Sequence, residues 1–149
     1  MIMHIRNIAV AIMTVMVMTG TGYASSLKTS CPAVESIQEK ENMTDKRIDY
    51  AAVVDGNTWT GYYKKAKLGA LKDKKVTLNQ VSIEDNQVQC YYQSANPKEM
   101  SLTLTLSEDF KVTKSGENWN SDAESTGVEN CTESNPALCK FDVETAGSN

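Results

Sequence analysis

The stretch SLTLTLS, residues 101–107, places leucine at every second position and serine or threonine between them. Successive side chains of a β-strand point to opposite faces, so this alternation predicts a strand that is buried on one side. Leu102, Leu104 and Leu106 should face the core, and the hydroxyl side chains should cover the other face.

The neighbouring stretch QVQCYYQ, residues 87–93, repeats the pattern with Val88, Cys90 and Tyr92 on one face. The segment before it, KVTLNQVSIED at residues 75–85, reads as its hairpin partner across the turn Glu84-Asp85-Asn86. Its apolar residues change phase near Gln80, which predicts a β-bulge there.

A second hairpin is expected upstream, where IDYAAVV and TWTGYY flank Asp55-Gly56-Asn57. The stretch CPAVESIQEK, residues 31–40, could begin a short helix capped by Ser30. The fold class is therefore α+β or mostly β, with one short N-terminal helix and an antiparallel sheet of about five or six strands over residues 25–113. Residues 114–149 are polar and without periodicity, and we expect an irregular tail held on the same domain by cysteines.

Residues 1–24 have the form of a secretory signal peptide. Arg6 precedes the apolar run IAVAIMTVMVM, and Gly22-Tyr23-Ala24 offers the small residues that a signal peptidase reads, so we expect cleavage after Ala24. The mature chain would have 125 residues, a formal net charge of −5, no transmembrane segment and a periplasmic or secreted location. Its acidity argues against a nucleic-acid partner.

Four cysteines would remain in this oxidising compartment, namely Cys31, Cys90, Cys131 and Cys139. An even number predicts two disulfides, for which three pairings exist. We favour Cys31 with Cys90 and Cys131 with Cys139, because the turn former Asn135-Pro136 could bring the ends of CTESNPALC together.

The arrangement of Cys31-Pro32, Ile37, Trp59-x-Gly61, Cys90-x-Tyr92 and a closing cysteine pair before Phe141 resembles a family of small exported proteobacterial proteins. That family is known only as a domain of unknown function. The resemblance spans residues 31–141 and implies a bacterial periplasmic or secreted protein, which an outer-membrane secretion system could pass on. It implies no catalytic residue.

The only histidine, His4, belongs to the predicted signal peptide, so the mature chain would hold no histidine-dependent triad, dyad or metal site. Glu84 with Asp85, or Glu108 with Asp109, could formally serve a two-carboxylate glycosidase, but acidic pairs at turns usually solvate the chain. We therefore expect neither an enzyme nor a cofactor or metal.

The stretch KKAKLGALKDKK, residues 64–75, is strongly basic in an otherwise acidic chain. A run of lysines can simply be a solvated connection between strands, or it can bind anions. Tyr62 and Tyr91 could add an exposed aromatic patch beside it. The predicted binding residues are Lys64, Lys65, Lys67, Lys72, Lys74, Lys75, Tyr62 and Tyr91.

These observations predict a monomeric, non-enzymatic exported binding protein, such as a secreted effector, that contacts anionic lipid headgroups or glycans. The alternative is a disulfide-stabilised inhibitor of an extracellular enzyme of the protease or lysozyme type, with DGNTWTG or CTESNPALC as the inhibitory loop. Such an inhibitor would have a host or other extracellular protein as its partner.

Overall fold

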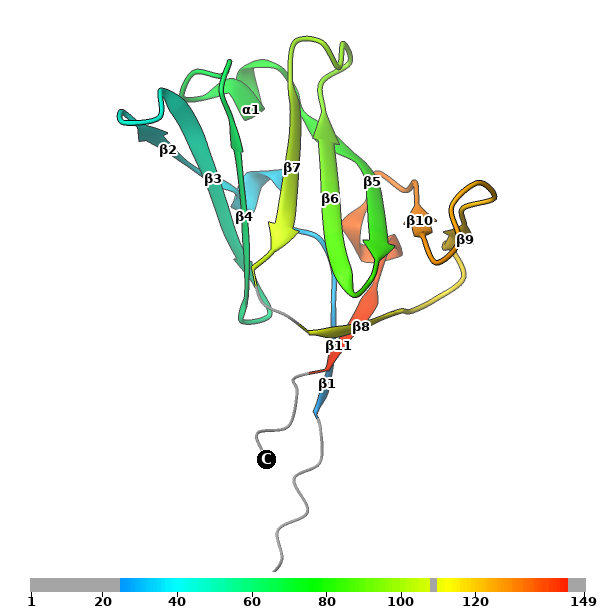
Figure 1. The fold of residues 1–149 in the computed structure, drawn as a ribbon. Helices are drawn as coiled ribbons and strands as arrows, with labels where there is room; N and C mark the ends of the chain where they lie inside the picture. Colours follow the sequence, from blue (N-terminus) through cyan, green and yellow to red (C-terminus); the bar gives the residue numbers. More distant parts are fainter. Residues whose placement is uncertain (1–24, 108–109, 145–149) are drawn as a thin grey trace, which may run out of the picture.

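The computed structural model describes residues 25–107 and 110–144, which form two antiparallel sheets (Figure 1). The large sheet has the strand order β2 (Gln38–Asn42), β3 (Arg47–Val54), β4 (Asn57–Tyr63), β7 (Ser101–Leu106), β6 (Gln87–Gln93), β5 (Thr77–Glu84), β10 (Glu129–Cys131) and β9 (Asn120–Ser121). The small sheet has the order β1 (Ser26–Thr29), β11 (Phe141–Glu144) and β8 (Lys111–Lys114). The helical segments are the short α1 (Ala70–Asp73) and the 3₁₀ turns η1 (Val34–Ser36) and η2 (Pro136–Leu138). The protein is thus mostly β, and the predicted antiparallel architecture is confirmed.

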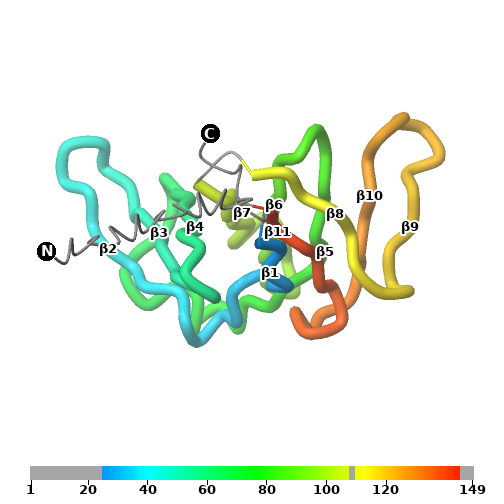
Figure 2. Tube along the Cα trace, turned by 90° about the horizontal axis from the view of Figure 1, so that it is seen from below, coloured from blue at the N-terminus to red at the C-terminus, as the bar shows by residue number. Residues whose placement is uncertain are grey.

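The large sheet is curved, and the small sheet lies across its inner side (Figures 1 and 2). Trp59 of β4 meets Phe141 of β11 edge to face, with ring centroids 6.0 Å apart, and both side chains are fully buried. Aromatic rings favour this geometry because the positive edge of one meets the negative face of the other. The contact therefore joins the two sheets in one core.

The alternating stretches behave as the sequence predicts. Leu102, Leu104 and Leu106 of β7 are buried, whereas the serine and threonines between them remain partly exposed. Val88, Cys90 and Tyr92 on the adjacent β6 are likewise fully buried. These two strands lie at the middle of the large sheet and supply much of its inner face.

Both predicted hairpins are present. Asp55 and Gly56 join β3 to β4, and Asp85 and Asn86 join β5 to β6; all four residues have positive φ. Two-residue turns of this kind match the right-handed twist of the strands they connect. The predicted bulge is confirmed as well, because the β5–β6 register shifts between Leu78 and Gln80.

The favoured disulfides are both formed. Cys31–Cys90 ties the chain between β1 and η1 to β6, and beside it the buried Tyr92 hydroxyl donates a 2.7 Å hydrogen bond to the carbonyl oxygen of Pro32. The segment that passes from the small sheet to the edge of the large one is thus fastened to a central strand.

The predicted N-terminal helix is wrong. Residues 34–36 make only the 3₁₀ turn η1, and residues 38–42 form edge strand β2, paired with β3. The apolar spacing of Val34 and Ile37 also suits a single turn, and so short a helix is marginal without further packing. Pairing with β3 instead gives the backbone groups of β2 their partners.

The sheet is larger than predicted, and the segment after residue 114 is not irregular. It contains β9, β10 and β11, and β11 is the central strand of the small sheet. These strands are two to four residues long, too short for periodicity to reveal. The helix α1, inside the lysine-rich stretch, was also not predicted.

Within the described residues, no helix is long and apolar enough to cross a membrane. The predicted signal peptide, residues 1–24, lies outside the described residues.

Replacing Cys31 and Cys90 together by alanine should lower the free energy of unfolding by about 4 kcal/mol, because that disulfide closes the longer loop in the unfolded chain. The Cys131→Ala/Cys139→Ala variant should lose less, about 2.5 kcal/mol. Urea denaturation of the two variants and the parent protein measures both losses. An equal or reversed order would show that the Cys31–Cys90 link is not the more stabilising of the two.

Gly61→Ala should destabilise the protein by about 3 kcal/mol, because overpacking against backbone cannot relax by rotating a side chain. A Cβ atom at Gly61 would collide with the Thr103 carbonyl oxygen and lie 2.9 Å from Leu104 Cδ2. The neighbouring exposed Thr60→Ala is the control and should cost less than about 1 kcal/mol. Urea denaturation is again the measurement, and equal stabilities of the two variants would show that β4 and β7 can move apart.

Candidate functional site

Three connections meet at one end of the large sheet. Antiparallel pairing places the start of β3 beside the end of β4, and the end of β6 beside the starts of β5 and β7. The β2–β3, β4–β5 and β6–β7 connections therefore lie together, at the top of Figure 1. The paired ends of β1 and β11, Ser26 and Glu144, lie at the opposite end.

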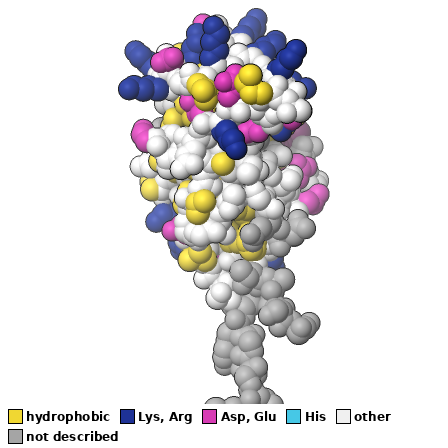
Figure 3. Space-filling model, turned by 90° about the vertical axis from the view of Figure 1, so that its left-hand side faces the viewer, with side chains coloured by type: hydrophobic (Ala, Val, Ile, Leu, Met, Phe, Trp, Pro, Cys, Tyr) yellow, Lys and Arg dark blue, Asp and Glu magenta, His cyan; other side chains and the backbone are white. Residues whose placement is uncertain are grey.

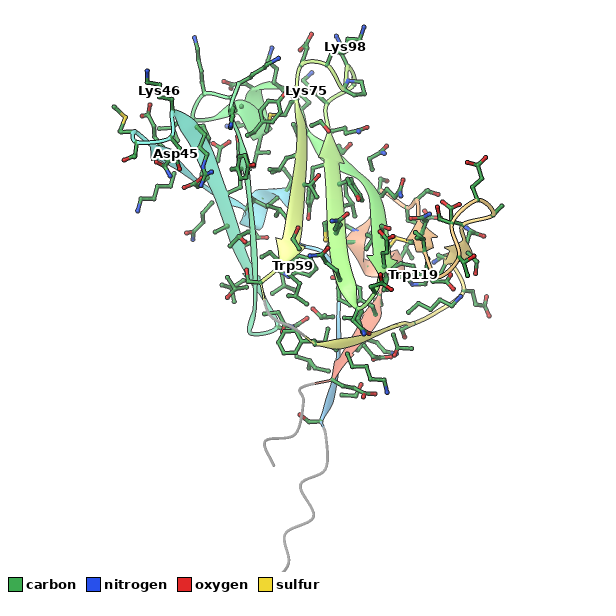
Figure 4. All side chains as sticks on the ribbon, in the orientation of Figure 1. Asp45, Lys46, Trp59, Lys75, Lys98 and Trp119 are labelled. Carbon is green, nitrogen blue, oxygen red and sulfur yellow. A yellow bond between two sulfur atoms is a disulfide. The ribbon has the colours of Figure 1, made fainter. Side chains whose placement is uncertain are left out.

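This end gathers lysines that are far apart in the sequence. Figure 3 shows the basic side chains crowded at the top of the molecule, and Figure 4 labels one from each connection, Lys46, Lys75 and Lys98. We call the exposed lysines of the three connections the basic end: Lys46, Lys64, Lys65, Lys67, Lys72, Lys74, Lys75 and Lys98. The structure thus brings the six predicted lysines together and adds Lys46 and Lys98, which sequence reasoning missed.

The basic end has a strong excess of positive charge. Its three connections, residues 43–46, 64–76 and 94–100, carry eight lysines and three acidic residues, a net charge of plus five. Among the described residues, only Lys74 of these lysines lies within ion-pair distance of a carboxylate, 3.2 Å from Glu99. Both side chains of that pair are about half exposed, so water and salt weaken the attraction.

The β4–β5 connection is anchored to the sheet from below. The Glu39 carboxylate, on β2, accepts hydrogen bonds from the backbone N–H of Gly69 at 2.6 Å and of Leu71 at 3.3 Å. Ala70 and Leu71 are buried beneath the connection, and Gly69 supplies the positive φ that lets the chain turn into α1. The lysines of the β4–β5 connection are therefore carried on a loop whose buried side is fixed to the sheet.

Two apolar side chains are exposed on the same connections. Met43 of the β2–β3 connection is 77% exposed, and Leu68 of the β4–β5 connection is 54% exposed. Large apolar side chains raised among lysines can enter the interfacial region of a bilayer while the ammonium groups remain at the headgroups.

The predicted tyrosines lie on the outer face of the sheet, which adjoins the basic end. Tyr62 is 53% exposed, and one side of its ring is covered by the Arg47 guanidinium, 4.3 Å from the ring centroid. Arg47 is itself held by Asp49, with Nε 2.6 Å from Oδ1. A hydrogen bond from Asn42 and the charge of Arg47 lower the pKa of Asp49, so the carboxylate stays ionised in this cluster.

Tyr91 is half-buried and is separated from Tyr62 by strand β7. It pairs with Thr103, and its hydroxyl donates to Gln89. Thr103 and Tyr62 line a shallow groove of about 500 Å³ together with Thr60, Gly61, Ser101 and Thr105. The tyrosines therefore share one sheet face, on which the groove between them has no charged lining residue, whereas the lysines belong to the connections at the end of the sheet.

No group of three or more histidine, cysteine, aspartate or glutamate side chains within the described residues has a metal-binding arrangement. Glu84 and Asp85 are exposed at the β5–β6 turn, and Glu108 with Asp109 lies outside the described residues. Of the two loops considered for inhibition, DGNTWTG is a tight hairpin with Trp59 fully buried. CTESNPALC is closed by its disulfide and exposes Leu138.

The family resemblance deduced from the cysteine, tryptophan and proline positions is confirmed by comparison with known proteins. No curated protein and no solved structure matches this chain. A family model matches residues 25–142, which include every described strand except the last residues of β11. The chain belongs to the family described as protein of unknown function (DUF3757).

Proposed function

We propose that this protein is an exported, non-enzymatic binding protein whose basic end docks on anionic lipid headgroups. The observation that carries the proposal is the convergence of eight exposed lysines from three separate connections, two of which also expose Met43 and Leu68. Each lysine near an anionic membrane surface contributes about 1 kcal/mol, and a few inserted apolar groups add hydrophobic binding. Neither the strand ends at the opposite pole nor the small sheet would obstruct the contact.

Two observations support export. All four cysteines are paired in disulfides, which persist in oxidising compartments. The family match begins at residue 25, directly after the proposed signal-peptidase site at Ala24. A monomer suffices for the proposed contact, because all eight lysines belong to one chain.

Lipid headgroups suit the basic end better than glycans do. The lysines belong to three separate connections spread over the end of the sheet, and the outer-face groove beside Tyr62 contains no charged lining residue. A glycan on Tyr62 and Tyr91 would therefore be held by hydroxyl groups and ring stacking, independently of the lysines.

An extracellular enzyme inhibitor is the second candidate, and the Cys131–Cys139 segment favours it. The Asn135 side chain accepts the N–H of Ala137, which caps η2, while Leu138 remains 45% exposed on the closed loop. Such a loop is rigid enough to enter a cleft. The test is inhibition of an extracellular protease or lysozyme. This function would be favoured if Leu138→Ala lost the inhibition and variants that lack lysines of the basic end retained it.

The variant Lys46→Gln/Lys65→Gln/Lys98→Gln, which removes one lysine from each connection, should bind vesicles containing phosphatidylserine or phosphatidylglycerol about 3 kcal/mol more weakly than the parent protein. Co-sedimentation at low and physiological salt measures the difference. Parent binding should weaken as salt screens the lysines.

The matched control is Lys28→Gln/Lys111→Gln/Lys140→Gln, which removes the same charge from outside the basic end. It should bind nearly as the parent protein does, because distant charges are screened. Equal losses in the two triple variants would mean that net charge alone governs binding. No vesicle binding by the parent protein would remove the proposed function and leave the glycan and inhibitor alternatives.

Met43→Ser/Leu68→Ser should bind the same vesicles several-fold more weakly and keep the same dependence on salt. Both side chains are exposed in the free protein, so the free energy of unfolding should change by less than about 1 kcal/mol. Vesicle co-sedimentation and urea denaturation together separate the two effects. If this variant bound vesicles as tightly as the parent protein, the two apolar side chains would not contribute and the contact would rest on the lysines alone.

A further inference from the structure

An amphipathic groove begins at the basic end and runs along the molecule beside η1. Its larger part encloses about 500 Å³, within the size range of small-molecule sites. The apolar part of its lining comes from Val34, Ile37, Leu71 and Val76. Three of these side chains are at least nine-tenths buried, so they form a floor rather than a loose surface.

The groove extends beyond its larger part. A second hollow of about 220 Å³ shares Val34, Glu35 and Val76 with the first, and it continues past Leu78 to Pro136 at the start of η2. The two hollows are therefore adjacent, and their lining residues extend from α1, along η1, to the Cys131–Cys139 segment. This shape suits a linear apolar chain better than a compact ring system.

Charge is distributed unevenly along the groove. Lys72 and Lys75 line only its α1 end, and neither lies within ion-pair distance of a carboxylate among the described residues. Glu39 lines the same part, but its two oxygens accept the backbone N–H groups of Gly69 and Leu71. Glu35, which is exposed, stands at the shared middle section. An anionic group therefore has its most favourable position at the α1 end.

We propose that this groove binds a single-chain anionic amphiphile, with its acidic group between Lys72 and Lys75 and its alkyl chain along the floor past Val34 toward Pro136. Binding would replace water over buried apolar side chains and pair two lysines that otherwise face solvent. The inference goes beyond membrane docking and does not depend on it, because one dissolved molecule fills the groove.

The probe is dodecanoate below its micelle concentration, measured by isothermal titration calorimetry and by methyl chemical shifts of valine and leucine in the oxidised mature protein. Dodecyl maltoside, which has the chain without the charge, and butyrate, which has the charge without the chain, should both bind much more weakly. Shifts should appear at Val34, Leu71 and Val76 and should be absent from Leu102 and Leu104, which face the closed core.

Lys72→Gln/Lys75→Gln should weaken dodecanoate binding roughly tenfold or more, because hydrogen bonds to charged groups are lost. The matched control Lys64→Gln/Lys65→Gln removes the same charge from the same connection but no lining residue, and it should leave dodecanoate affinity within about twofold. Glu35→Gln should strengthen binding, since it removes an exposed carboxylate from the groove. Val34→Phe, which narrows the groove, should weaken dodecanoate binding.

Equal weakening by the two lysine variants, or equal binding of dodecanoate and dodecyl maltoside, would overturn the proposal. Shifts confined to residues outside the groove would do so too. Vesicle co-sedimentation of the same two variants tests membrane docking separately. Both lysine pairs belong to the basic end, so the two variants should bind vesicles equally weakly. Only Lys72→Gln/Lys75→Gln should also bind dodecanoate more weakly.

Discussion

The link between Cys31 and Cys90, together with the hydrogen bond from Tyr92 to Pro32, is the constraint on which the rest of the structure depends. The chain leaves the small sheet after β1 and must cross to β2, at the far edge of the large sheet. That crossing contains little regular structure of its own. The disulfide fastens this segment to β6. It also lowers the entropy of the unfolded chain, which stabilises the folded protein by about 4 kcal/mol.

The sequence predicts the centre of the large sheet better than its edges, for a physical reason. Central strands such as β7 must bury one face, so Leu102, Leu104 and Leu106 carry a period of two. Edge strand β2, QEKEN, buries no side chain completely and is stabilised mainly by backbone pairing with β3. Because backbone hydrogen bonds require no particular side chain, periodicity cannot distinguish such a strand from a helix or a loop.

The candidate site was predictable only where it is local in sequence. Six lysines between residues 64 and 75 stand out in an acidic chain, whereas Lys46 and Lys98 are single lysines in separate turns. Their place at the basic end follows from the order β2-β3-β4-β7-β6-β5, which sets three alternate connections at one end. Tyr62 and Tyr91 were correctly expected on strands, but β7 lies between their strands, which sequence spacing could not reveal.

The same crossing segment connects stability with the proposed binding. Val34 follows Cys31 and Pro32 by only a few residues and forms one wall of the groove, while Pro136, inside the second disulfide loop, lies at its far end. The segment that carries Val34 and the loop that carries Pro136 are thus each fixed by a disulfide. On the opposite side of the groove, the hydrogen bonds to Glu39 fix α1. Within the described residues no helix is longer than the four residues of α1. An apolar surface groove can nevertheless stay open here, because the segments that would otherwise collapse into it are tied to neighbouring strands.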